Sequence, residues 1–177
     1  MIDDKAIIQY LRRCYFAADG LWFTKLEEEH SYDYALRIDE LVWEVLPKIQ
    51  ARKAKDLLNI EGGSLADLLR ALELKFMAES YQYQTIELTP SLLRIGINEC
   101  PWLNILEKAG KIRCALDICE NVCTRDFAGW AAQFSPAISF TLGRTLAAGE
   151  SICELVFNCS QVVKTLPHID AERDAAG

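Results

Sequence analysis

Residues 83–98 of the chain read YQTIELTPSLLRIGIN, and here the spacing of apolar side chains changes from a helical period to a period of two. Apolar residues alternate with other residues both before and after the segment Thr89-Pro90-Ser91. Alternation on both sides of a short turn sequence is typical of a β-hairpin. We therefore predict two antiparallel strands over residues 83–98.

The residues before this hairpin carry apolar side chains at helical spacing. They predict helices over residues 3 to about 30, residues 31 to about 59 and residues 64 to about 80. Ser31 and Ser64 are suitable N-caps, because a serine hydroxyl accepts a hydrogen bond from a free backbone N–H of the first helical turn. We expect Gly20 to bend or break the first helix and Pro47 to kink or break the second.

After the hairpin the chain is helical again over the cysteine-rich residues 100–123, CPWLNILEKAGKIRCALDICENVC, with an interruption near Gly110. A short helix over residues 126–134 and a second hairpin over residues 137–157 follow. Two hairpins separated by helices predict an α+β fold in which helices cover one face of a four-stranded antiparallel sheet. We assign residues 1–159 to one domain, with a helical part (1–80) and a part holding the sheet and the cysteine-rich helices (81–159). Residues 160–177 have no periodicity and are predicted to be a flexible tail.

Composition limits the partners and the location of the chain. The net charge is -7, and acidic proteins are poorly suited to bind the phosphate backbone, so we expect no nucleic-acid partner. No apolar run approaches the roughly 20 residues needed to cross a bilayer, so no membrane association is expected. The first residues do not have the pattern of a secretory signal, which indicates a cytosolic protein with reduced cysteines. The odd total of seven cysteines also argues against a framework of disulfides.

The cysteines of residues 100–123 are the strongest chemical signal. Cys100 stands directly before Pro101, a residue favoured at the first position of a helix, so Cys100 is a predicted N-cap. The positive end of the helix dipole lowers the pKa of a thiol at such a position and favours the nucleophilic thiolate. Cys119 and Cys123 are four residues apart and share one face of a helix.

These observations predict a thiol-based metal site. Its proposed ligands are Cys100, Cys119, Cys123 and Cys153, with at least three sulfur atoms within about 8 Å of one another. Thiolates suit zinc or an iron–sulfur cluster, although the spacing matches no standard zinc finger or ferredoxin. The alternative is that these cysteines pack in the core as small apolar residues.

The four tryptophans, Trp22, Trp43, Trp102 and Trp130, allow two interpretations. The first is that they belong to the core, because no basic groove accompanies them as it would in a base-stacking surface. The second is that they line an apolar ligand pocket.

Several segments of the C-terminal half match the order and spacing of a known family. They are Cys100-Pro101-Trp102, the stretch from Ile118 to Asp126, Arg144 to Glu150 and Cys153 to Phe157. Over about residues 98–158 the chain resembles the L-2-amino-thiazoline-4-carboxylic acid hydrolase-like family and the related 4-vinyl reductase-type ligand-binding domains. The resemblance implies a helical layer on a four-stranded antiparallel sheet, a small-molecule pocket between the layers, and a homodimer.

Two functions are therefore predicted. The first is a cytosolic domain that binds or senses a small-molecule ligand or a metal through the cysteine cluster. The second is an enzyme, a hydrolase of a small cyclic amide-like or thiazoline substrate, with Cys100 as nucleophile and Asp126 or Glu28 as base or water-orienting group.

Overall fold

The computed structural model describes residues 2–160 of the chain. Its sheet contains four antiparallel strands in the order β1-β2-β4-β3: β1 (Gln82–Leu88), β2 (Leu92–Glu99), β3 (Ile138–Leu142) and β4 (Cys153–Cys159). Both predicted hairpins are present, and β2 and β4 join them at the centre of the sheet. The predicted α+β class and the antiparallel sheet are thereby confirmed.

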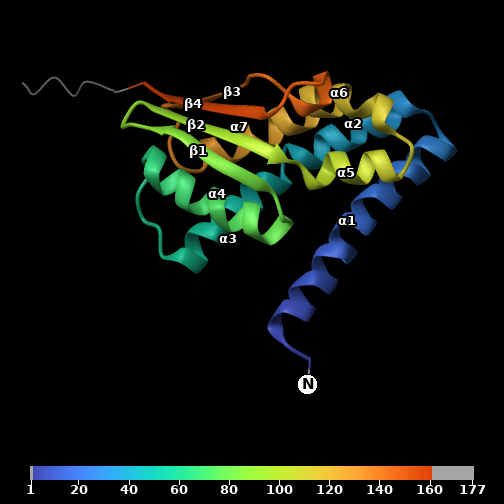
Figure 1. Ribbon diagram of the computed structural model, residues 1–177, viewed down its shortest axis with the longest axis horizontal. Coiled ribbons are helices and arrows are strands. Elements are labelled where there is room, and N and C mark those ends of the chain that lie inside the picture. The colour runs from blue at the N-terminus through green and yellow to red at the C-terminus, as the bar shows by residue number, and fades with distance from the viewer. Residues whose placement is uncertain (1, 161–177) are drawn as a thin grey trace, which may run out of the picture.

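Helices gather on one side of this sheet (Figure 1). They are α1 (Asp4–Glu29), α2 (Tyr32–Trp43), α3 (Leu46–Leu58), α4 (Leu65–Glu79), α5 (Pro101–Lys108), α6 (Ala115–Ile118) and α7 (Thr124–Ala132). The inward face of β2 and β4 packs against them, and its residues pair across the strands as Leu93 with Phe157 and Ile95 with Leu155. All four side chains are essentially inaccessible to solvent. The hydrophobic core thus lies between the sheet and the helices α3, α4 and α7.

Local sequence chemistry sets the helix boundaries. The Ser31 hydroxyl accepts a hydrogen bond from Tyr34 N, and Ser64 forms a reciprocal capping box with Asp67. Pro47 lies in the first turn of α3, where its missing N–H is not needed. The segment 31–59 is accordingly two helices, with the break near Leu46 that Pro47 predicts.

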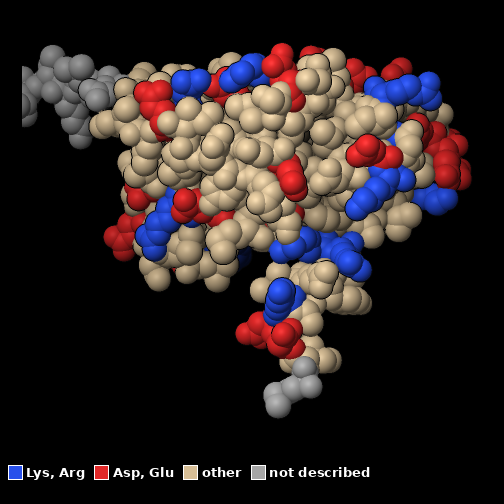
Figure 2. All heavy atoms as spheres, viewed as in Figure 1, with Lys and Arg blue, Asp and Glu red and all other residues tan. Residues whose placement is uncertain are grey.

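Helix α1 is continuous through Gly20, so the expected break at this glycine is wrong. The N-terminal part of α1 stands away from the rest of the molecule (Figures 1 and 2). Its apolar side chains there, including Ile7, Ile8 and Leu11, are exposed, and Arg12 ties it to the end of α4 through a bond to Met77 O. On the face shown in Figure 2, basic side chains are interspersed with acidic ones.

The cysteine-rich segment is less regular than predicted. Gly110, with a positive φ of 69°, separates α5 from a short 3-10 turn, as its sequence position indicates. Between α6 and α7, residues Cys119–Cys123 form a π-helical turn, η2. Such wide turns occur mainly as single insertions in α-helices and often at functional sites.

The remaining predictions concern membrane association, the C-terminal tail, the homodimer and the cytosolic location. Within residues 2–160, no helix is long and apolar enough to cross a membrane. The predicted tail lies outside the described residues except for Ser160. A homodimer and a cytosolic location stay predictions.

Candidate ligand-binding cavity

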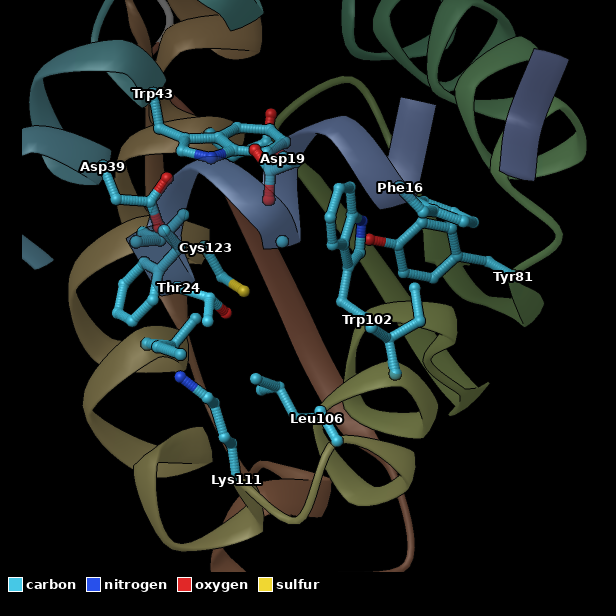
Figure 3. Close-up of a pocket in the computed structure, with 17 residues that line it drawn as sticks. Phe16, Asp19, Thr24, Asp39, Trp43, Tyr81, Trp102, Leu106, Lys111 and Cys123 are labelled. Atoms are coloured by element: carbon cyan, nitrogen blue, oxygen red, sulfur yellow. The ribbon is translucent and has the colours of Figure 1, made fainter. Parts of the chain in front are cut away.

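A cavity of about 100 Å³ lies among α1, α2, α5 and the η2–α7 segment (Figure 3). Its walls are mainly apolar and include five aromatic rings: Phe16, Phe23, Trp43, Tyr81 and Trp102. The Trp102 ring contacts two of the others edge-to-face. Its centroid lies 4.6 Å from that of Phe16 and 5.6 Å from that of Trp43. These edge-to-face contacts fix the shape of the wall.

The spacing of residues along α1 explains how this helix forms one wall. Gly20 follows Phe16 by four residues, and Phe23 and Thr24 follow Gly20 by three and by four, so these positions share the face that meets the cavity. At Gly20 the wall is hollow, because a Cβ atom built there would meet nothing within 4 Å. A larger residue at this position would project into the space that the aromatic rings surround.

A second cleft, of about 260 Å³, adjoins the cavity between α1 and α2. The two hollows share Asp19, Phe23 and Asp39 in their linings. Trp22 lines the cleft and is largely exposed, so its expected place in the core is wrong. Trp43 and Trp102 fit the alternative interpretation, the lining of a pocket.

Two carboxyl groups face the cavity, Asp19 from α1 and Asp39 from α2 (Figure 3). Burial raises the pKa of Asp19 to about 6, and the negative charge of Glu79 adds to the rise. Burial likewise raises the pKa of Asp39 to about 7, with a contribution from Asp19 and a smaller opposing one from the Trp43 indole. Among residues 2–160, no basic group forms an ion pair with either carboxyl.

Beside the cavity, Lys75 of α4 forms a buried ionic network. Its Nζ lies 2.9 Å from Glu79 Oε1 and 3.1 Å from Asp126 Oδ2, and its side chain is only 1% exposed. Burial lowers the pKa of this ammonium, but the two carboxylates outweigh that effect and raise it overall. Glu79 Oε2 also accepts a bond of 3.1 Å from Trp102 Nε1, which links the network to the aromatic wall.

Asp126 is the member of this network that lines the cavity. Burial raises its pKa to about 6, against the opposing effect of Lys75. Its Oδ1 has no hydrogen-bond partner in the described part of the chain, and neither does the nearby Trp130 Nε1. The indole lies close enough to lower the pKa of Asp126, but no well-aligned hydrogen bond joins the two groups.

The four predicted metal ligands lie in the lining of a separate, much smaller cavity of about 20 Å³ beside the inner face of the sheet: Cys100, Cys119, Cys123 and Cys153. Cys153 accepts a 3.2 Å bond from Leu146 N. Tyr81 and Cys123 line both cavities and form the wall between them. Over residues 2–160, no group of three or more His, Cys, Asp or Glu side chains has an arrangement suited to a metal ion. The zinc or iron–sulfur site therefore stays a prediction that this geometry does not favour.

The predicted activation of Cys100 is wrong. Burial raises the pKa of its thiol to about 12, and the backbone N–H groups of Leu103 and Trp102 lower it by less than burial raises it. The thiol with a lowered pKa is Cys119, because Cys123 is hydrogen-bonded to it. The helix N-terminus thus changes the pKa of the Cys100 thiol less than the removal of this thiol from water does.

The three predicted catalytic residues do not form one site. Cys100 lines the small cavity and Asp126 the large one. Glu28 lies on the exposed side of α1, pairs with Lys25 and lines neither. The residues that sequence reasoning missed are Asp19 and Asp39. Each stands four residues before an aromatic residue of the cavity wall, Phe23 and Trp43, and this spacing was the available signal.

The fold and the cavity define a small α+β domain with an aromatic-lined hollow among its helices. Residues 3–160 match a family described as a family of unknown function (DUF6125), and the chain belongs to this family. The hydrolase-like family that the motifs of residues 98–158 resemble is not shown by this match, and that resemblance stays a prediction. No curated protein matches the chain in sequence.

Solved structures that share the fold include the following two. One is a trafficking protein particle complex subunit 3 from Naegleria fowleri, covalently bound to palmitic acid, with a TM-score of 0.63, 9% identity, and coverage of 86% of this chain and 97% of that one. The other is the phenol-responsive sensory domain of the transcription activator PoxR with phenol, with a TM-score of 0.54, 10% identity, and coverage of 81% and 73%. At these identities the similarity shows the fold alone.

Proposed function

We propose that this chain is a binding or sensing domain for a small, largely apolar molecule held in the cavity among α1, α2, α5 and α7. The observation that carries the proposal is the cavity wall itself, in which five aromatic rings surround a hollow next to a few polar groups. Small-molecule sites in proteins are concave, mainly apolar, and oriented by a small number of polar side chains.

The size of the hollow indicates the size of the molecule. An apolar cavity of about 150 Å³ holds benzene. A cavity of about 100 Å³ that adjoins a cleft of about 260 Å³ suits a ligand with one or two rings. The two proteins of the same fold were solved with phenol and with palmitic acid, and both molecules are largely apolar, which supports the same class of ligand here.

The geometry favours binding over hydrolysis of a cyclic amide-like or thiazoline substrate. A hydrolase of that kind needs a nucleophile and a base within hydrogen-bond reach of each other. Here the Cys100 thiol has a raised pKa and lines a different cavity from Asp126.

The test is a titration of the ¹⁵N-labelled protein with 2-phenylethanol, followed through the indole N–H resonances. Trp43 and Trp102 line the cavity, and we expect their signals to shift with saturation. Trp130 is buried and lines neither hollow, but its indole lies next to Asp126 of the cavity wall, so its signal should shift less than those of Trp43 and Trp102. If the signals of Trp43 and Trp102 do not move up to the solubility of the compound, the proposal is wrong.

A further inference from the structure

The cavity has more acidic than basic groups around it. Asp19, Asp39 and Asp126 line it, and Glu79 lies directly behind Trp102. Lys75 already pairs with two of these four carboxylates. Asp19 and Asp39 face the hollow with no ion pair to any residue in the range 2–160.

The other lysine at the cavity does not change this balance. Lys111 also lines it, but its Nζ forms an ion pair with Glu27 and lies 5.6 Å above the ring of Phe23. Its charge is therefore already compensated. A negative ligand would meet four acidic groups, and the part of the chain described by the structure places no free cation at the cavity to receive it.

A second observation is a buried acceptor in the cavity wall that no well-aligned donor contacts. Asp126 is only 4% exposed and lines the cavity, and its Oδ1 has no partner within the described chain. A buried acceptor left unpaired costs about 1–3 kcal/mol. A ligand that brings N–H groups into the cavity would supply what this oxygen lacks.

The aromatic rings are suited to a positive charge as well as to an apolar ring. Lys75 Nζ lies 5.4 Å from the centroid of Trp43 and 5.9 Å from that of Trp130, so these indoles already contact a cation inside the protein. Aromatic faces attract ammonium groups through their quadrupole, and the attraction grows when water is excluded.

We propose that the ligand is an organic amine with one or two rings, whose protonated nitrogen lies between Asp19 and Asp39 and whose ring lies against Phe16, Trp43 and Trp102. This inference rests on the proposed function and specifies the class of ligand for the same cavity. An apolar ring explains the wall, and the ammonium explains why two carboxyl groups face the hollow without an ion pair to any described residue.

The amine also predicts a linkage to pH. A carboxyl whose pKa is raised to about 6 or about 7 is partly protonated near neutrality, so binding of a cation must release a proton. Affinity for an amine should therefore rise with pH up to about 8, while affinity for a neutral analogue should not. The titratable and charged groups around Asp19 and Asp39 are Tyr15 on α1, Glu40 on α2, Lys75 and Glu79 on α4, Lys111 after α5, Cys123 on η2 and Asp126 on α7.

The experiment compares three compounds with the same ring and a two-carbon side chain: 2-phenylethylamine, 2-phenylethanol and phenylacetate. At pH 7.5 we expect the amine to bind at least about tenfold more tightly than the alcohol, which corresponds to one charged hydrogen bond, and phenylacetate to bind most weakly. In the wild type, affinity for the amine should also rise between pH 5.5 and pH 8.

Matched variants locate the charge recognition. Asp39→Asn and Asp19→Asn should each weaken binding of the amine about fivefold or more and leave the alcohol within about twofold, because only the charged contact is lost. Asp56→Asn is the control, since Asp56 lies exposed on α3 and pairs only with Lys53. It should change neither affinity.

The outcomes separate the two proposals. If the alcohol binds and the amine binds no more tightly, the amine inference is overturned and the proposed function stands. If none of the compounds binds, the proposed function fails, and the amine inference fails with it. The pH series on the wild type tests the charge independently of whether the variants fold.

Discussion

Replacing Gly20 with leucine should make the protein more stable and at the same time unable to bind its ligand. Gly20 lies in the interior of α1, lines the cavity, and has nothing within 4 Å of the position of a Cβ atom. Its φ is not positive, so any L-residue fits the backbone. A glycine in a helix interior costs about 0.8–1 kcal/mol relative to alanine, and this cost is removed.

The leucine adds a second effect because its side chain enters the hollow. Burial of a whole leucine side chain contributes about 1.5–3 kcal/mol, so partial burial here should contribute about half as much. Together the two effects predict a gain of about 2 kcal/mol in the free energy of unfolding. For a domain of this length, each 1 kcal/mol raises the Tm by about 2–4 °C.

The assay measures urea unfolding and 2-phenylethanol binding for wild type, Gly20→Ala and Gly20→Leu. Alanine should supply the gain in helix propensity without filling the cavity, so this variant should be stabilised and still bind. Leucine should be stabilised further and lose binding. Wild-type affinity in Gly20→Leu would mean that the space at Gly20 is not the ligand site. A lower stability than that of Gly20→Ala would mean that leucine does not fit this space, and either result would refute the reasoning.

Three further predictions follow from buried charges and thiols. Because the pKa of Asp39 is raised, its buried carboxylate destabilises the fold above about pH 7, whereas its protonated form below about pH 4 does not. Asp39→Asn should therefore raise the Tm at pH 8 but hardly at pH 4. An equal rise at both pH values would be inconsistent with a buried charge. Lys75→Met leaves two buried carboxylates without their ammonium and should cost about 3–5 kcal/mol in urea unfolding, whereas Lys53→Met, at an exposed pair, should cost less than about 1 kcal/mol. Iodoacetamide at pH 7.5, with labelled sites read by mass spectrometry, should modify Cys119 before Cys100, and the reverse order would restore Cys100 as the activated thiol.

The strands and helix boundaries were predictable because their signals are local. The alternation in residues 83–98 specifies β1 and β2 without knowledge of any other segment, and Ser31, Pro47 and Ser64 set helix ends through their own hydrogen-bonding chemistry. The pairing of β2 with β4 joins segments about sixty residues apart, and no local pattern contains it. The order of the strands therefore required the structure.

The candidate site was harder to predict because its properties depend on burial. An acidic residue such as Asp19 or Asp39 in an amphipathic helix normally lies on the solvent side. The packing of α1 against α2 instead turns both toward a shared hollow. Cys100 shows the same limit, since its place before Pro101 indicated the helix N-terminus correctly but not the burial that dominates its pKa.

The aromatic cavity and the cysteine cluster belong to one region of the molecule. From the sequence alone they are two separate hypotheses. Tyr81 and Cys123 form the wall between the aromatic cavity and the small cavity of the four cysteines. Cys123 ends the π-helical turn η2, and it is hydrogen-bonded to Cys119 within that turn. A molecule in the aromatic cavity would therefore contact the irregular turn that carries the cysteine pair. Single π-turns of this kind occur frequently at functional sites, and this one lies where the two hollows meet.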